Sequence, residues 1–319
     1  MSFSVGVIGL GSIGANYDLD DTSQSRVLSH MKAFTTHDKF DILGAVDVEQ
    51  LARDRCESHY DVPVFATVGE FYEHHKPDVI VVATPTETHL SVIRECLSYG
   101  PPKVFLCEKP LAGNSKDGEI ICQLCSDLGI HIYVNYIRRS DPGVIEVKKR
   151  LDDGVIRGPV KALVWYSKGL LHSGCHFLDL LNFWFGDTKH SELIPRQRLS
   201  KDRDENPDFF VTFEKASAVF YSVPDGHTDY FAVEVLFSNG RLRLDQFGKL
   251  IWEDSFRGCD KGHQRYEVLS SNMDRYQFNV VDGLVNVLEN QDGELCVGAA
   301  ALDQVKVIEQ IVKAANRER

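Results

Sequence analysis

The sequence predicts an α/β fold of two domains, with a doubly wound parallel sheet in residues 1–136 and a second domain in residues 137–319. Three observations predict it. A chain of 319 residues is long enough for about two domains of ~150 residues each. Short apolar runs alternate with helical stretches through the first part, as in a parallel sheet whose strands are joined by helices. The glycine-rich stretch GLGSIG directly follows the first apolar run.

Five apolar runs predict the strands of the first domain. They are continuously apolar rather than alternating, as expected for strands that are buried on both faces. The runs cover residues 5–8, 42–46, 79–83, 104–106 and 132–134. Apolar stripes at helical spacing lie between them, for example Leu90, Ile93 and Leu97.

The second half is rich in predicted strands. They cover residues 159–167, 209–213 and 218–223, and a hairpin joins residues 229–237 to residues 241–247. The hairpin turn is expected at Asn239 and Gly240, a dipeptide that favours a type I′ turn. Helices are expected at residues 276–288 and 300–315, and the last of these is expected to be able to pack back on the first domain.

Composition excludes several classes of protein. The formal net charge is -12 and no long basic run is present, which argues against nucleic acid as a partner. No apolar run approaches the ~18 residues of a membrane span. No basic residue precedes Arg26, so the start of a secretory signal is missing, and eight scattered cysteines then indicate reduced thiols in a cytoplasmic protein. Cys122 and Cys125 lie on a helical stripe and are expected to pack in the core rather than bind metal.

The glycine-rich turn predicts a dinucleotide site. Gly9, Gly11 and Gly14 have G-x-G-x-x-G spacing just after a predicted strand, which is the context that gives this pattern meaning. The turn, including Ser12 and Ile13, would bring backbone N–H groups at a helix N-terminus to a pyrophosphate. The alternative is a glycine-rich turn without a ligand.

Asp47 ends the second predicted strand and is expected to accept hydrogen bonds from the adenosine ribose. Its charge would repel a 2′-phosphate, so it favours NAD over NADP. Gly14 and Asp47 are 33 residues apart, against about 20 in the usual pattern. The excess is expected in the acidic polar stretch of residues 16–25. The alternative for Asp47 is an ordinary residue in the turn after the strand.

The stretch ATPTETH follows the run at residues 79–83 and lies at the carboxyl edge of the predicted sheet, where ligands bind in open α/β folds. Thr84, Pro85 and Thr86 are therefore expected near the cofactor, with Thr86 capping the next helix. His89 would lie in the first turn of that helix, either touching the cofactor or on the helix surface.

The stretch VFLCEKPLAG places a charged pair at the same edge. Pro110 stops the strand, and Glu108 and Lys109 are left at the rim where the nicotinamide end of a dinucleotide would lie. A lysine can take the proton of a substrate hydroxyl if its pKa falls, and burial and a nearby positive charge both lower it. Glu108 is expected to hold the amine by a hydrogen bond. The alternative is a solvated surface ion pair.

The stretches GVIGLGSIG, AVD, VVATPTETH and VFLCEKPLAG, in that order, resemble the Gfo/Idh/MocA oxidoreductase family, which includes glucose–fructose oxidoreductase and inositol dehydrogenase. The resemblance extends through YVNYIRRSDP into SGCHFLDLLNFWFG. After that segment it holds only in outline. It implies a Rossmann domain followed by an α+β domain with a large open antiparallel sheet. It also implies that Lys109 is the catalytic lysine of the E-K-P motif.

The resemblance assigns further residues. His176 matches a histidine of substrate binding and proton transfer, Asp179 an aspartate on the same helix face, and Arg139 the basic residue of the R-x-D-P segment. The segment WYSKGLLHSGCHFLDLL is similar to members from surface-sugar or amino-sugar pathways, and it adds Trp165 and Lys168 as substrate-binding residues.

His172 is a departure from the family. Many members have an aspartate four residues before the histidine, and here that position is His172. Positions four apart share a helix face, so His172 and His176 could share a proton, bind substrate or, as a remote alternative, bind metal. The simple Lys-Asp-His set of inositol dehydrogenases is therefore in doubt.

These observations lead to an expected function. The chain would be an NAD-dependent oxidoreductase that moves hydride between nicotinamide and a hydroxyl or carbonyl carbon of a sugar, sugar derivative or polyol. It would form a homodimer or homotetramer through the C-terminal sheet. Two alternatives remain: a non-catalytic NAD(H) sensor of the same fold, and an enzyme that recycles its NAD while bound.

Overall fold

The structure is a computed structural model, and it describes residues 2–21, 25–158, 160–195, 206–223, 230–245, 248, 250–254, 265–269, 271–289, 291 and 293–317. Its Cα positions fall into two compact units. Unit 1 contains Met1–Ser140 and Asp274–Val305, and unit 2 contains Asp141–Met273 and Lys306–Arg319. The first division, after residue 140, lies close to the predicted boundary after residue 136, but residues 274–305 group with unit 1.

Unit 1 is built on a seven-stranded sheet with the order β15-β6-β5-β4-β1-β2-β3. Every pairing is parallel except that of β15 with β6. This order, with its reversal between β1 and β4, is that of a Rossmann fold and confirms the predicted fold class. The strands are β1 (Phe3–Ile8), β2 (Phe40–Val46), β3 (Val64–Phe65), β4 (Val79–Val82), β5 (Val104–Cys107), β6 (His131–Val134) and β15 (Cys296–Val297). The five predicted strands are all present, whereas β3 and β15, of two residues each, were not predicted.

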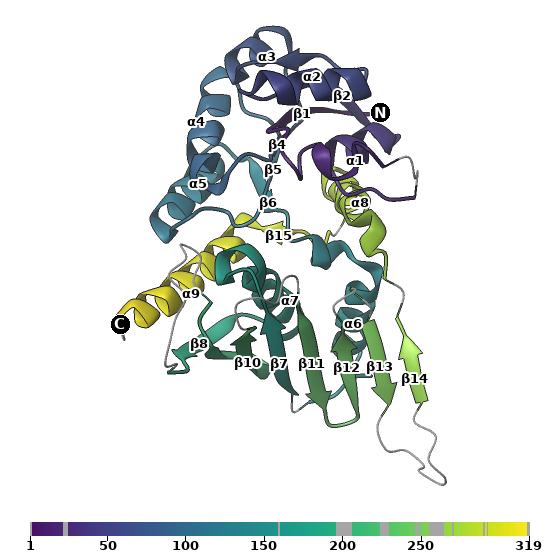
Figure 1. Cartoon of the computed structure of the whole chain (residues 1–319), viewed down its shortest axis with the longest axis vertical. Coiled ribbons are helices and arrows are strands. Elements are labelled where there is room, and N and C mark those ends of the chain that lie inside the picture. Colours follow the sequence, from purple (N-terminus) through teal and green to yellow (C-terminus); the bar gives the residue numbers. More distant parts are fainter. Residues whose placement is uncertain are drawn as a thin grey trace. The chain divides into compact units, whose positions relative to one another are not determined.

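Helices cover both faces of this sheet (Figure 1). One face packs on α1 and α8, and its core includes Val5, Val7, Phe34 and Leu284. The other layer contains α3, α4 and α5, and Gly6 of β1 leaves room there for the ring of Phe71. The helices are α1 (His30–Thr36), α2 (Gln50–His59), α3 (Val68–His74), α4 (His89–Tyr99), α5 (Ser115–Asp127), α8 (Tyr276–Leu288) and α9 (Gly298–Arg317).

The predicted insertion interrupts the first helix of the unit. Residues 11–17 form one helical turn, in which Ala15 N donates to Gly11 O at 3.0 Å, and the chain then leaves through the 3-10 turn Asn16–Asp18. It returns at His30, whose N–H donates to Ile13 O at 3.0 Å. Asp18 is buried and connects the two ends of the insertion, because its Oδ2 accepts a hydrogen bond from Leu28 N at 2.6 Å. The helix therefore resumes where it stopped, which explains the long spacing between Gly14 and Asp47.

The start of β4 is held by Asp78, which accepts hydrogen bonds from the backbone and side chain of Ser4, both at 2.9 Å. Its carboxylate also pairs with Lys103 Nζ at 2.9 Å. Burial alone would raise the pKa of Asp78, but the contacts with Ser4 and Lys103 outweigh it and hold this pKa below its ordinary value.

Residues 274–305 complete unit 1 because two of their elements pair with early ones. α8 packs its apolar face on α1, with Val280, Val281 and Leu284 buried. β15 extends the sheet, with Cys296 opposite Val134. The first turns of α9 follow, and Leu302 lies against Gly118 of α5.

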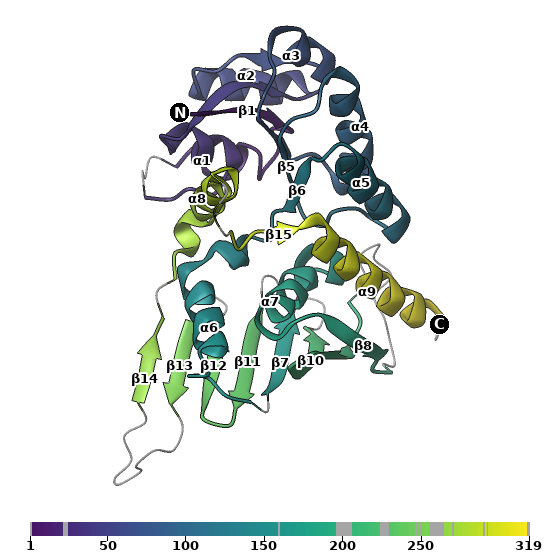
Figure 2. The same ribbon diagram turned by 180° about the vertical axis from the view of Figure 1, so that it is seen from behind.

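Unit 2 is an eight-stranded sheet with two helices on one face (Figure 2). The strand order is β14-β13-β12-β11-β7-β10-β9-β8, and all pairings are antiparallel except that of β10 with β7. The strands are β7 (Val160–Tyr166), β8 (Thr188–Leu193), β9 (Phe209–Phe213), β10 (Ala216–Ser222), β11 (Ala232–Phe237), β12 (Gly240–Leu244), β13 (Leu250–Asp254) and β14 (Arg265–Val268). The helices are α6 (Pro142–Asp152) and α7 (Cys175–Phe185), preceded by a π-helix at Leu170–Gly174.

The predicted hairpin is present as β11 and β12, but its turn is one residue earlier than expected. Phe237 pairs with Gly240, so the turn residues are Ser238 and Asn239. The Asn239 side chain explains the difference, because it accepts from Arg157 N at 2.9 Å and donates to Val155 O at 2.8 Å. The ends of the two predicted strands, at residues 229 and 246–247, lie outside the described residues. No helix in the described part of the chain is both long and apolar enough to span a bilayer.

Candidate functional site

The glycine turn after β1 is shaped by its three glycines in different ways. Gly9 has φ +99°, and a Cβ there would lie 2.6 Å from the carbonyl of Ala83 at the end of β4. A Cβ on Gly14 would lie 2.0 Å from Gly9 O. A Cβ on Gly11 would meet nothing within 4 Å, and Gly11 is exposed. Gly9 and Gly14 are therefore required by the protein itself, while Gly11 leaves an open approach to the turn that fits a pyrophosphate.

Asp47 lies directly after β2, beside this turn. Its Oδ2 accepts from Leu10 N at 2.6 Å, and its Oδ1 accepts from Glu49 N at 2.9 Å. Each oxygen keeps a second lone pair for a ribose hydroxyl. The Arg53 guanidinium donates to Asp47 O at 2.6 Å and to Val48 O at 3.0 Å, so it is held against the backbone of the same corner.

The β4–α4 corner differs from the prediction in its helix cap. Thr88, not Thr86, is the N-cap of α4, because Thr86 begins a 3-10 turn (Thr86–Thr88) that precedes the helix. Thr84 is half-buried and accepts from Thr88 Oγ1 at 2.9 Å. Pro85 is exposed at the same edge of the sheet.

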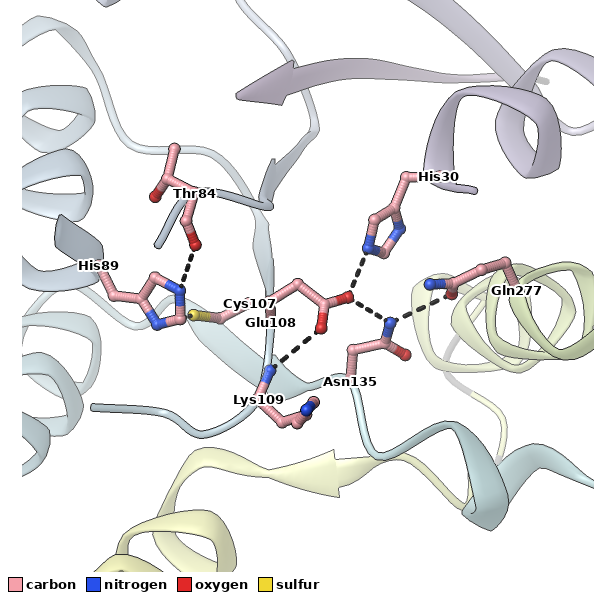
Figure 3. Close-up of polar contacts among 8 residues, drawn as sticks. All are labelled: His30, Thr84, His89, Cys107, Glu108, Lys109, Asn135 and Gln277. Atoms are coloured by element: carbon pink, nitrogen blue, oxygen red, sulfur yellow. Dashed lines mark hydrogen bonds and ion pairs between the residues drawn. The ribbon is translucent and has the colours of Figure 1, made fainter. Parts of the chain in front are cut away.

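His89 is completely buried and does not lie on the helix surface. Its Nε2 contacts Thr84 O at 3.0 Å, and its Nδ1 lies 3.3 Å from Cys107 Sγ (Figure 3). The same Nδ1 lies 3.2 Å from Leu111 O. Burial raises the pKa of the Cys107 thiol well above its ordinary value, so Cys107 keeps a proton that it can share with Nδ1. The imidazole thus connects the loops after β4 and β5.

Glu108 and Lys109 follow β5 at the same edge, and the bond between Lys109 and Pro110 is cis. Glu108 is only 8% exposed. Its Oε1 accepts from His30 Nε2 at 2.8 Å and from Asn135 Nδ2 at 2.6 Å, and its Oε2 lies 3.3 Å from Lys109 N (Figure 3). The contact of Glu108 with Lys109 therefore involves the backbone N–H rather than the expected amine.

The carboxyl of Glu108 is held ionised by its neighbours. Burial alone would raise the pKa of Glu108, but the contacts with His30 and Asn135 and the positive charge of Lys109 outweigh it, and the pKa is lowered. The buried site therefore carries a fixed negative charge next to the lysine.

Three residues of this network were missed in the sequence. Asn135 follows β6 and also donates to Gln277 Oε1 of α8 at 3.1 Å. The position of Asn135 at a strand end was a usable signal, whereas His30 and Gln277 lie far from Glu108 in sequence and no motif marks them. Because the carboxylate can only accept, it fixes the Asn135 amide with its nitrogen toward Glu108.

The predicted residues of unit 2 lie around the start of α7. His172 is exposed within the π-helix, His176 is half-buried in α7, and Asp179 is completely buried. Gly174 N donates to Gly169 O at 3.0 Å, which is the wide turn of a π-helix. The two histidines differ in burial, and His172 is the more exposed.

Trp165 and Lys168 lie at the end of β7. Trp165 is 37% exposed, and its ring is tilted by 35° to that of Tyr221 with the centroids 5.4 Å apart, on the sheet face opposite to the buried Val164 and Tyr166. The alternation of β7 places Trp165 on the face of the sheet away from the core. Lys168 has φ 59°, a rare value for a residue with a side chain, of the kind that clusters at functional sites.

Arg139 belongs to unit 1 and is half-buried in the 3-10 turn Ile137–Ser140. No cluster of three or more metal-binding side chains occurs among the residues described. Cys122 and Cys125 are unbridged, and Cys125 is buried with its pKa raised to about 12 by burial and by Cys122.

Comparison with known proteins agrees with this geometry. Residues 3–136 match the family model described as "Oxidoreductase family, NAD-binding Rossmann fold", the Gfo/Idh/MocA family. In this segment the chain is similar to the Gfo/Idh/MocA oxidoreductases. The match covers the glycine turn, Asp47, the β4–α4 corner and the E-K-P motif in one segment.

Proteins similar to this chain include inositol 2-dehydrogenase 1 of Saccharopolyspora erythraea, 29% identical over 164 residues. The alignment covers 50% of this chain and 44% of that relative, so this chain spans less than half the length of the relative it matches.

Solved structures share the fold over the whole chain. An oxidoreductase from Agrobacterium radiobacter, in complex with NAD+, L-tartaric acid and magnesium, has a TM-score of 0.80 at 15% identity and covers 100% of this chain and 98% of its own. The WlbA dehydrogenase from Bordetella pertussis, in complex with NADH and UDP-GlcNAcA, has a TM-score of 0.79 at 16% identity and covers 100% of this chain and 96% of its own.

Proposed function

We propose that this protein is an NAD-dependent oxidoreductase that acts on a CH–OH group of a sugar, a sugar derivative or a polyol. The observation that carries the proposal is the arrangement of unit 1. The glycine turn after β1 and Lys109 after β5 lie at one carboxyl edge of a Rossmann sheet, and a buried ionised carboxylate adjoins the lysine. The names of the inositol dehydrogenase relatives support the substrate class.

The cofactor would be held by the turn and by the neighbouring strand ends. Gly9, Gly11, Ser12, Ile13 and Gly14 would receive the pyrophosphate, and Asp47 the adenosine ribose. Thr84, Pro85, Thr86 and the segment of Glu108 and Lys109 would line the continuation of the site toward the nicotinamide. When bound, NAD supplies the acceptor or donor of the hydride. The Asp47 carboxylate disfavours the extra phosphate of NADP, because both would be negatively charged.

Lys109 would exchange the proton of the reacting hydroxyl. A half-buried lysine beside a fixed negative charge can hold a proton at its Nζ, and a substrate hydroxyl within hydrogen-bond reach can give or take that proton. His176 would assist this transfer. Asp179 and Arg139 would orient sugar hydroxyls, with His172 and Lys168 as further contacts. In this proposal Trp165 belongs to the open face of the sheet, and that face would join subunits of a homodimer or homotetramer.

The test is turnover on a panel of polyols, sugars and nucleotide sugars with NAD, comparing the wild-type protein with Lys109→Met. Methionine keeps the length of the side chain and removes the amine. We expect loss of at least about 100-fold in kcat, in the range of general acid–base catalysis, with unchanged affinity for NAD. Full turnover by Lys109→Met would refute the assignment of the base.

A non-catalytic sensor is the second candidate, and the observation that favours it is His172 in the place of the usual aspartate. Tight NAD binding without any reduction across the panel would select the sensor. Reduction of bound NAD limited to one equivalent, with added NAD unused, would select an enzyme that recycles its cofactor.

A further inference from the structure

We propose that His30 is a positioning residue for Lys109 and acts through the Glu108 carboxylate. The inference deepens the proposed function and rests on it for the catalytic meaning of Lys109. His30 belongs to none of the motifs in the sequence, and it reaches the site only because the first helix is interrupted and resumes at this residue.

The contact between His30 and Glu108 is completely buried on the histidine side. His30 is 0% exposed, and its Nε2 lies 2.8 Å from Glu108 Oε1 (Figure 3). Its Nδ1 is buried without a hydrogen-bond partner among the described residues. Because a carboxylate can only accept, Nε2 carries the proton in this contact and donates it to Glu108.

The hydrogen bonds fix which carboxylate oxygen faces the lysine. Oε1 accepts from both His30 and Asn135, and this pair of donors holds the plane of the carboxylate. Oε2 is thereby directed to Lys109 N, 3.3 Å away. The backbone at Lys109 sets the direction in which the side chain leaves the sheet edge. The imidazole of His30 therefore helps to orient the Lys109 amine and also holds the Glu108 charge beside it.

Other ionisable groups near Glu108 come from several elements. Lys109 adjoins it in sequence, and Tyr276 of α8 is close enough for its pKa to be raised by burial and by the charge of Glu108. Tyr17, Asp18 and Arg26 of the insertion also act on Tyr276. Of these groups, only His30 and Lys109 contact the Glu108 carboxylate in the described part of the structure, apart from the neutral amide of Asn135.

The return of the chain from the insertion places the imidazole. His30 N donates to Ile13 O at 3.0 Å and Met31 N donates to Gly14 O at 2.9 Å, so the start of α1 is anchored to the glycine turn itself. Ser29 caps α1 by accepting from Lys32 N at 3.3 Å, and Ser29 N donates to Asp18 Oδ2 at 3.1 Å. The glycine turn and the E-K-P segment are thus connected through one side chain.

The experiment compares His30→Leu and His30→Phe, which remove the donor, with His30→Gln, which retains an N–H at similar reach. The Glu108 carboxyl and the Lys109 amine are titrated by NMR in protein labelled at Glu Cδ and Lys Nζ, with Glu108→Gln and Lys109→Met identifying the two signals. Losing a hydrogen bond to a charged group should raise the pKa of Glu108 by about one to two units in the apolar variants, and His30→Gln should restore it. Thermal unfolding and NAD affinity serve as folding controls, and Phe fills the ring's space if Leu does not fold.

Activity is measured in parallel. We expect the acid limb of the pH profile of kcat/KM to move to higher pH by the same one to two units in the apolar variants. At a pH below this limb, their kcat/KM should be about 10- to 100-fold lower than that of the wild type, and His30→Gln should be close to the wild type. Unchanged titrations of Glu108 and Lys109 in a folded apolar variant would overturn the inference, whatever the activity. Shifted titrations in a protein that binds NAD but turns over no substrate would leave the positioning role standing and refute the proposed function instead.

Discussion

Substituting alanine at Gly11 and at Gly14 should separate cofactor binding from stability. The two glycines lie three residues apart in one turn, but their surroundings are opposite. A Cβ on Gly11 meets nothing within 4 Å, whereas a Cβ on Gly14 lies 2.0 Å from Gly9 O and 2.9 Å from Gly9 C. Both of those atoms belong to the backbone, so no side chain can move aside to relieve the contact.

The magnitudes follow from these contacts. Gly14→Ala is an overpacking substitution and should cost about 1–3 kcal/mol of unfolding free energy. For a unit of this size that corresponds to a decrease in Tm of about 2–12 °C. Gly11→Ala should leave Tm unchanged in the absence of cofactor. Its methyl group should keep the pyrophosphate from one backbone N–H, a loss of about 1.5–3 kcal/mol, or about 10- to 100-fold in the Kd for NAD.

The assay is thermal unfolding without cofactor together with calorimetric titration of NAD. Gly11→Ala should change only the affinity, and Gly14→Ala should change both quantities. Two results would refute the reasoning: wild-type NAD affinity in Gly11→Ala, which would mean that the open side of the turn is not the phosphate site, or a wild-type Tm in Gly14→Ala.

Four further predictions concern single residues. Asp47→Asn keeps an acceptor but removes the charge, so the ratio of the Kd values for NADP and NAD should fall by about tenfold in titrations with both cofactors. Asp141 has a buried carboxylate that accepts four hydrogen bonds and caps α6. Asp141→Ala should lower the free energy of unfolding in urea by about 2–4 kcal/mol. Asp153→Ala, at an exposed position, is the control and should lower it by less than about 0.5 kcal/mol. The pKa of Asp78 is lowered in the folded protein, so its ionised carboxylate stabilises the fold at every pH above the unfolded pKa of about 3.9. This stabilisation is lost as the pH falls through the folded pKa. The difference in unfolding free energy between wild type and Asp78→Asn should therefore be present at about pH 7 and shrink below pH ~4. Among the described cysteines, Cys122 is the half-buried one, and the pKa of Cys125 is raised to about 12. Iodoacetamide at pH 8 should therefore label Cys122 before Cys125, as followed by mass spectrometry. Faster labelling of Cys125 would contradict the burial assignment.

Patterns local in sequence were sufficient for much of the fold. The apolar runs gave the central strands, and the glycine spacing gave the turn, because both depend on neighbours within a few residues. The hairpin turn was misplaced by one residue because Asn239 bonds to the backbone at Val155 and Arg157, far away along the chain. Such tertiary contacts leave no mark on the local pattern.

The site was predictable to a similar extent. Lys109 and Asp47 follow strands and could be found by that rule. His30 could not, because its contact with Glu108 depends on the path of the insertion before it. The π-helix before α7 was also unforeseen, since a single wide turn leaves no distinct mark on the apolar spacing of the segment.

The late residues that finish unit 1 have a consequence for the nascent protein. α8 and β15 leave the ribosome only after all the strands of unit 2 have been made. Until then, the apolar side of α1 has no cover and the outer edge of β6 has no partner strand, two features that invite aggregation. A truncated gene that stops at codon 136 should therefore yield insoluble product, and a useful nucleotide-binding fragment would need residues 274–305 joined back to it by a short linker.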